Sequence, residues 1–91
     1  MSDQLLGAYS PYTCEISKEA KEAFAQAIRV ILGVEYSPVA VSSQVVAGMN
    51  YKFFCNTKSV TLYPKNGAAI VSIYAPLPGQ GSAHVTHIQS L

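Results

Sequence analysis

Charged residues are sparse in this sequence, and long apolar runs are missing from it. Six Lys and Arg residues and five Asp and Glu residues make up 12% of the 91 residues and give a formal net charge of +1. The basic residues are scattered and form no stripe that would neutralise a run of phosphates, so nucleic acid is not an expected partner. No apolar run approaches the roughly 20 residues needed to cross a bilayer, so no membrane is expected as a partner either.

Cysteine is also scarce. Cys14 and Cys55 are too few and too far apart for a zinc site built on CxxC pairs or for a disulfide-dense scaffold. Two alternatives remain: two reduced thiols, or one bridge between Cys55 and Cys14, which precedes the expected helix. Neither cysteine lies in a recognisable nucleophile motif, so we do not expect an enzyme that pairs a thiol with His84 or His87.

The residues that are present are typical of one globular domain. Hydrophobic residues make up 49% of the chain, and no repeat, low-complexity tract or composition shift divides it. We therefore predict a single domain over residues 1–91. Residues 1–6 lack the basic start and apolar stretch of a signal peptide, so we expect a cytoplasmic protein, or an extracytoplasmic one if a signal was removed.

A helix is predicted near residues 18–32. Ser17 is a suitable N-cap, Glu19 and Glu22 stand where the helix dipole favours anions, and Gly33 follows as the stop. Apolar residues recur at intervals of three and four and predict one buried stripe, formed by Ala20, Ala23, Phe24, Ala27, Ile28 and Ile31.

Strand-like alternation replaces the helical period after Pro38. The run 39–46 predicts a strand with Val39, Val41 and Val45 on one side, and an irregular arm with a short extended stretch is expected before the helix. A second long run, residues 50–62, places alternate side chains on one face, namely Tyr51, Phe53 and Cys55.

Two further strands are expected. A turn over residues 64–67, in which Gly67 would supply a positive φ, joins the second run to a strand over 68–74. A last strand over 83–89 would carry Val85 and His87 on one face and His84, Thr86 and Ile88 on the other. The two histidines would then point apart and share no metal ion, and we expect neither metal nor cofactor. This order of elements predicts the α+β class, with one helix packed across a curved antiparallel sheet of four to five strands.

Three short segments share a resemblance: the run Gln44-Val45-Val46-Ala47-Gly48, the arm Leu5-Leu6-Gly7-Ala8 and the turn Leu77-Pro78-Gly79-Gln80. The first reads as the QVVAG signature of the cystatin and stefin superfamily, and the other two are similar to the arm and the second hairpin of that superfamily. The chain has no tryptophan, so its turn resembles that of stefins rather than the Pro-Trp pair of secreted cystatins. Cys14 and Cys55 do not match the paired C-terminal cysteines of secreted cystatins.

The resemblance implies a cystatin-like fold and a reversible, competitive, tight-binding inhibitor of papain-like cysteine proteases, not an enzyme. It implies that Leu6 enters an unprimed apolar pocket beside Leu5, with Gly7 as a pivot. The remaining contacts that it implies are the central wedge and the primed-side turn, formed by Val45, Val46, Ala47, Gly48, Leu77 and Pro78.

Gln44 is also predicted among the protease-binding residues, where it is expected to support the hairpin by hydrogen bonds rather than to touch the catalytic pair. An alternative from another class is a cystatin-fold interaction module that binds another protein or self-associates by exchanging elements. We expect a monomer, and a domain-swapped dimer would instead indicate the self-associating alternative.

Overall fold

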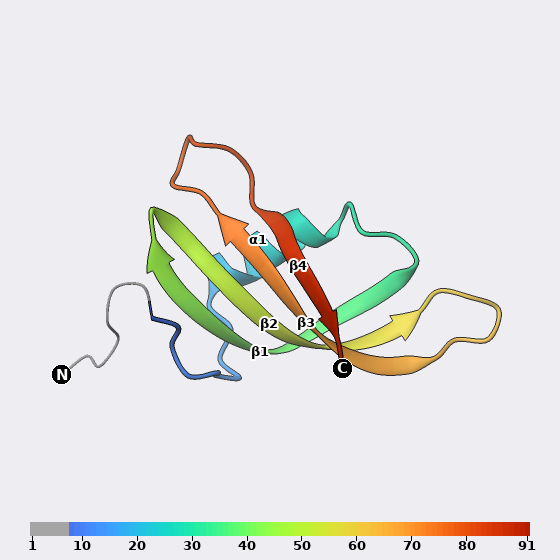
Figure 1. Cartoon of the computed structure of the whole chain (residues 1–91). Helices are drawn as coiled ribbons and strands as arrows, with labels where there is room; N and C mark the ends of the chain where they lie inside the picture. Colours follow the sequence, from blue (N-terminus) through green and yellow to red (C-terminus); the bar gives the residue numbers. More distant parts are fainter. Residues whose placement is uncertain (1–7) are drawn as a thin grey trace.

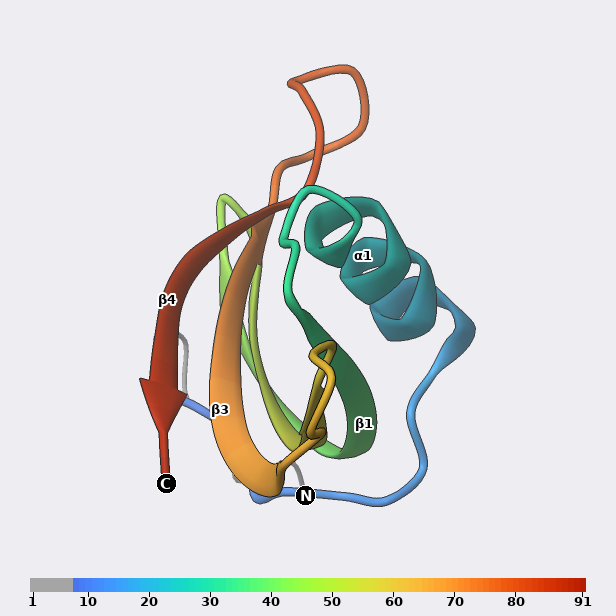
Figure 2. The ribbon, with the colours of Figure 1, turned by 90° about the vertical axis from the view of Figure 1, so that its right-hand side faces the viewer.

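The computed structural model describes residues 8–91 and places one helix against one face of a four-stranded sheet (Figure 1). The elements are α1 (Lys18–Ile28), β1 (Val34–Val46), β2 (Gly48–Ser59), β3 (Asn66–Ala75) and β4 (His84–Ser90). The strand order is β1-β2-β3-β4, and each neighbouring pair is antiparallel. The sheet curves around α1, which lies on its concave side (Figure 2). The predicted α+β class is confirmed.

The start of α1 matches the prediction, and so does the buried stripe as far as Ile28, whereas Ile31 lies beyond the helix and outside the core. The Ser17 side chain accepts a hydrogen bond of 3.1 Å from the Ala20 amide, which satisfies one of the free donors of the first turn. The Phe24 ring meets the Phe53 ring edge-on with centroids 4.9 Å apart, and this contact joins helix to sheet. No helix within residues 8–91 is long and apolar enough to cross a membrane.

The predicted end of the helix is wrong. The helix ends at Ile28 rather than near residue 32, and the Ile31 amide instead bonds to the Ile28 carbonyl at 2.9 Å in a turn. Ile28, Val30 and Ile31 are β-branched, and such residues lose side-chain freedom in a helix. Gly33, with φ of +90°, then reverses the chain into β1.

The predicted faces of β1 are wrong because a β-bulge at Val39 interrupts the strand. Pro38 pairs with Cys55 and Ala40 pairs with Phe54, so Val39 is an extra residue in the ladder. The strand also begins before Pro38, at Val34. Because the bulge changes the parity of the strand, Val39 is exposed and does not share a face with the buried Val41.

The hairpin between β2 and β3 is present, but its turn lies earlier than predicted. β2 ends at Ser59 rather than at residue 62, and the connection covers residues 60–65. Asn66 and Gly67 belong to β3, opposite Lys58 and Thr57, and Gly67 does not have a positive φ. Tyr51, Phe53 and Cys55 share one face of β2, as predicted, and all three are buried.

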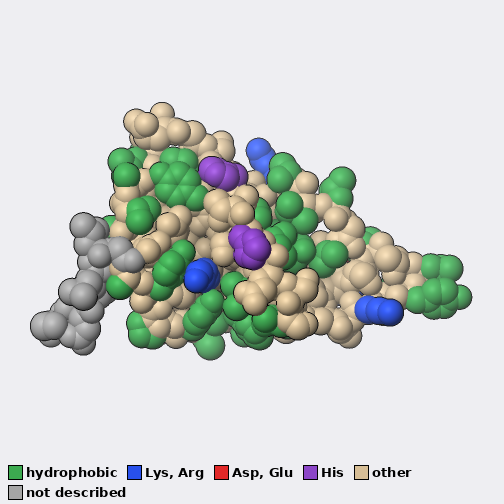
Figure 3. All heavy atoms as spheres, viewed as in Figure 1, with side chains coloured by type: hydrophobic (Ala, Val, Ile, Leu, Met, Phe, Trp, Pro, Cys, Tyr) green, Lys and Arg blue, Asp and Glu red, His purple; other side chains and the backbone are tan. Residues whose placement is uncertain are grey.

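The predicted faces of β4 are also wrong, because a second bulge interrupts this strand. Ser72 pairs with His87 and Ile73 pairs with Val85, so Thr86 is the extra residue. Val85 and Ile88 therefore both pack against the core. His84 and His87 lie on the same outer face, contrary to the prediction, and Figure 3 shows both imidazoles from that side. Within residues 8–91, no three His, Cys, Asp or Glu residues are grouped to hold a metal ion.

The segment 9–13 lies beside β1 and extends the sheet at that edge. Tyr9 lies opposite Gln44 and Thr13 opposite Val41, and the Thr13 and Val41 backbones exchange two hydrogen bonds of 2.9 Å. The sheet therefore has four continuous strands and one short irregular neighbour, the extended stretch expected before the helix.

The two cysteines are both free, so the bridge that the sequence left open is not formed. Cys55 is fully buried among the core side chains, and Cys14 is exposed. Burial raises the pKa of the Cys55 thiol to about 11, because the thiolate would lose its hydration. Cys55 therefore acts as a small core residue rather than as a nucleophile.

Candidate functional site

The tip of the β1–β2 hairpin presents apolar residues at one end of the sheet. Val45 is 43% exposed, and Ala47 at the turn is also exposed. Gly48, which begins β2, is buried. Monomeric proteins seldom expose contiguous apolar groups without a reason, so this tip is a candidate interface.

Gly48 is required at the tip by both its conformation and its surroundings. Its φ is +108°, which side-chain-bearing residues rarely adopt. A Cβ atom placed there would lie 2.5 Å from the Ala75 carbonyl oxygen and 3.1 Å from the Tyr74 hydroxyl oxygen. The resemblance singled out Gly48 as part of the central wedge, and the structure adds that it permits close approach between β2 and β3.

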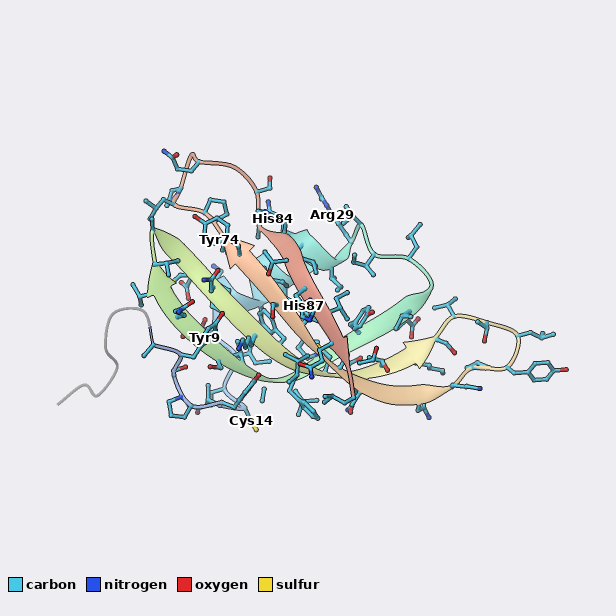
Figure 4. The ribbon with its side chains drawn as sticks, viewed as in Figure 1. Tyr9, Cys14, Arg29, Tyr74, His84 and His87 are labelled. Carbon is cyan, nitrogen blue, oxygen red and sulfur yellow. The ribbon has the colours of Figure 1, made fainter. Side chains whose placement is uncertain are left out.

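Tyr74 is a site residue that the sequence reasoning missed. Its hydroxyl donates a hydrogen bond to the carbonyl of Ala47, at the turn of the neighbouring hairpin. Its ring also meets the His84 ring edge-on at 5.8 Å, as their labelled positions show (Figure 4). The register between β2 and β3, which pairs Tyr74 with Asn50, brings it within reach of the tip, and no local sequence pattern reveals that register.

Gln44 fastens the two strands of the same hairpin. Its side-chain oxygen accepts a hydrogen bond of 2.8 Å from the Asn50 side-chain amide, directly across the ladder. This is the supporting role expected for Gln44. Together with Tyr74, it holds the tip in one conformation.

The connection between β3 and β4 contains a tight turn that presents Leu77. The Gln80 amide donates to the Leu77 carbonyl at 2.9 Å, and Gly79 has a φ of +81°. Pro78 followed by a glycine of positive φ is the pattern of a type II turn. Leu77 is 51% exposed, so the turn carries a second apolar group.

The hairpin tip and this turn lie at the same end of the sheet and border one open depression of about 440 Å³. Its walls come from both segments and from the first turn of α1, and include Val45, Val46, Gly48, Leu77, Pro78 and Glu19. The sequence-predicted residues of the two loops are thus brought together by the fold. We call this surface the hairpin end.

Gln26 is a second residue that the sequence reasoning missed. Its side-chain oxygen accepts a hydrogen bond of 2.8 Å from the Ala83 amide, across the gap between α1 and the β3–β4 connection. Ala83 is itself buried. This bond fixes the C-terminal side of the connection that carries Leu77.

The first described residues of the N-terminal arm lie beside the β1–β2 hairpin. The Tyr9 ring lies over the Lys52 ammonium, with 4.3 Å from nitrogen to ring centroid, and the Ser10 amide bonds to the Ser43 carbonyl at 2.8 Å. Burial raises the pKa of Tyr9 above its ordinary value. The predicted contact residues Leu5, Leu6 and Gly7 lie outside the described residues.

The chemistry offered by the hairpin end is that of a contact surface. Its exposed side chains, Val45 and Leu77 among them, are apolar, with Glu19 as the carboxylate at its border. Cys55, with its raised pKa, lies in the core away from this depression. These residues suit recognition by shape and apolar burial.

The whole chain was compared with known proteins in three ways. Comparison with protein-family models, with curated proteins and with solved structures found no match.

Proposed function

We propose that this chain is a reversible, competitive inhibitor of papain-like cysteine proteases, cystatin-like in fold and stefin-like in its turn. The observation that carries the proposal is the joint position of the QVVAG run and the Leu77–Pro78 turn on one apolar, exposed end of the sheet. Both segments must lie at the same end of the sheet if they are to contact one protease groove at the same time.

The proposed mechanism needs no chemistry from the inhibitor. A papain-like protease holds a thiolate and an imidazole at the bottom of a groove, and cleavage requires a scissile bond in attack geometry. The tip residues Val45, Val46 and Ala47 would fill this groove while presenting no such bond. Leu77 and Pro78 would cover the primed side, and Leu5 and Leu6 the unprimed side.

Rigidity of the hairpin end supports tight binding. The Tyr74 hydroxyl, the Gln44–Asn50 bond and the close approach at Gly48 fix the tip before any partner arrives. A surface already held in its bound conformation loses less entropy on association. The tip is therefore a preformed wedge in this proposal.

The proposal is tested by steady-state titration of papain with the wild-type chain and with a matched pair of variants. Val45→Asp places a charge in the proposed contact, and Val39→Asp places the same charge on the same strand at the exposed bulge. We expect stoichiometric inhibition by the wild type and by Val39→Asp.

For Val45→Asp we expect inhibition about 100-fold weaker or more, since an unpaired charge buried at an interface costs several kcal/mol. Competitive kinetics against a peptide substrate are expected for the wild type. Absence of inhibition by the folded wild-type chain at micromolar excess would contradict the proposal, as would equal inhibition by the two variants.

A further inference from the structure

A second apolar surface lies at the opposite end of the sheet from the hairpin end. There the connection between α1 and β1 meets the connection between β2 and β3, and the Val60 amide bonds to the Gly33 carbonyl at 2.9 Å. Figure 1 shows the β2–β3 connection reaching beyond the rest of the molecule at that end. We call this surface the loop end, formed by residues 30–35 and 58–65.

Large side chains of the loop end are more exposed than those of the hairpin end. Leu32 is 87% exposed, Leu62 86% and Tyr63 81%, and Val30 and Val60 are exposed as well. Five of the ten large exposed hydrophobic residues within 8–91 thus gather in two adjoining loops. So many apolar groups left in water mark a contact surface.

The charge of the loop end restricts what its partner is. Lys58 and Lys65 are exposed there, and Glu35 lies opposite Lys58 across the ladder, so two positive charges and one negative charge leave a net charge of +1. Arg29 lies by the end of α1, apart from the projecting connection (Figure 4). Two copies meeting through this end would bring like charges together, which opposes self-association. An anionic partner is favoured instead.

The shape of the loop end favours a lipid surface over an acidic protein. Leu62 and Tyr63 belong to the β2–β3 connection, which projects from the molecule in Figure 1, and Figure 3 shows hydrophobic atoms at that extremity with a basic side chain set back from them. A projecting apolar tip enters a bilayer interface without needing a concave acceptor, and cations set behind it reach the headgroups. Tyrosine is enriched at that depth because its ring is apolar and its hydroxyl polar.

We infer that the loop end binds the surface of an anionic lipid bilayer, with Leu62 and Tyr63 inserted and with Lys58 and Lys65 at the headgroups. Contact with a bilayer surface needs no spanning segment. The inference does not depend on the proposed inhibition. It would leave the hairpin end directed away from the bilayer, since the two surfaces lie at opposite ends of the sheet.

The test is co-sedimentation of the full chain with vesicles of phosphatidylcholine alone and of phosphatidylcholine mixed with phosphatidylserine. We expect binding to the mixed vesicles that weakens as salt is added, and little binding to phosphatidylcholine alone. The double variant Leu62→Ser/Tyr63→Ser should lower the partition coefficient at least about tenfold. Lys58→Gln/Lys65→Gln should lower it by a similar factor, on the mixed vesicles only.

The matched control is Val45→Ser/Leu77→Ser, which removes two exposed apolar groups from the hairpin end and should leave vesicle binding unchanged. Thermal melting checks that each variant is folded. Failure of the wild type to bind the mixed vesicles would overturn the inference, as would equal binding by all variants.

Two further outcomes would assign the loop end to another partner and so overturn the inference. One is a concentration-dependent dimer that disappears in Leu62→Ser/Tyr63→Ser, which would make this surface a contact between copies. The other is retention on immobilised polyglutamate, lost in both loop-end variants, without vesicle binding, which would point to an acidic protein.

Discussion

The two ends of the sheet expose apolar residues in different ways. At the hairpin end, Val45 and Leu77 are about half exposed and stand on segments held by bonds from Tyr74 and Gln26. At the loop end, Leu62 is almost fully exposed on a connection joined to its neighbour by the Val60–Gly33 bond. The first suits a partner with a shaped groove, and the second suits a deformable partner such as a bilayer interface.

The largest expected effect is on the free energy of unfolding, and it appears when one glycine at each end is replaced. Gly48→Ala should lower the free energy of unfolding by about 3–5 kcal/mol, because the new Cβ meets the Ala75 carbonyl and the backbone is strained. Gly33→Ala has similar backbone strain but nothing within 4 Å of its Cβ, so about 1–2 kcal/mol is expected. Urea unfolding of both variants measures the difference, and equal losses would show that close packing does not distinguish the two ends.

The core between the two ends should respond to alkaline pH through Cys55. The thiol has a pKa of about 11 in the fold against an ordinary value of 9.0, so the unfolded chain loses its proton first as pH rises. The contribution of this thiol to the free energy of unfolding is therefore fully present below pH 9. The free energy of unfolding should fall by about 2 kcal/mol between pH 9 and 11.

Unfolding titrations of the wild type and of Cys55→Ala across that pH range isolate the thiol from the tyrosines, whose loss of protons is common to both proteins. The wild-type slope should be steeper. Identical slopes in the two proteins would contradict the assignment to Cys55.

A smaller effect is expected from removing one hydroxyl at each end. Tyr74→Phe deletes the bond to the Ala47 carbonyl and should cost about 1 kcal/mol of stability, with inhibition of papain weakened about threefold to tenfold by a looser tip. Tyr63→Phe, at the exposed loop end, should change neither quantity.

Thermal melting and inhibition assays measure both variants, and size-exclusion chromatography shows whether the looser tip of Tyr74→Phe leads to an exchanged dimer. Matching behaviour of the two tyrosine variants would remove the proposed role of Tyr74.

The smallest effect on stability is expected from Leu62→Ser/Tyr63→Ser. Both side chains are more than four-fifths exposed, so their loss removes little buried surface and should change stability by no more than about 0.5 kcal/mol. A drop in melting temperature well beyond that range would indicate that the loop end packs within the fold rather than offering a contact surface.

Several parts of the fold were predictable from local sequence. Ser17 marks the helix start because a side-chain oxygen before an apolar stripe satisfies free amides, and the stripe itself follows from helical geometry. Alternation along β2 gave the buried face containing Tyr51 and Phe53, because no bulge interrupts that strand. The QVVAG run fell at a hairpin tip, where a glycine of positive φ is required.

Other parts depend on pairing between distant segments. Single extra residues at Val39 and Thr86 invert the side-chain parity of their strands, and nothing local to either residue announces this. Tyr74 and Gln26 act on backbone groups 27 and 57 residues away in sequence, so their roles appear only once the register is known. The loop end likewise forms only because two connections meet in space.

The most direct test of the proposed wedge is the inhibition constant for papain of two matched variants, Leu77→Ser and Leu62→Ser. Each replaces one exposed leucine, at the hairpin end or at the loop end, and neither should perturb the core. Leu77→Ser should raise the constant about tenfold, because burial of a leucine contributes roughly 1.5–3 kcal/mol, while Leu62→Ser should leave it unchanged. A constant raised by Leu62→Ser and unaltered by Leu77→Ser would contradict the assignment of inhibition to the hairpin end.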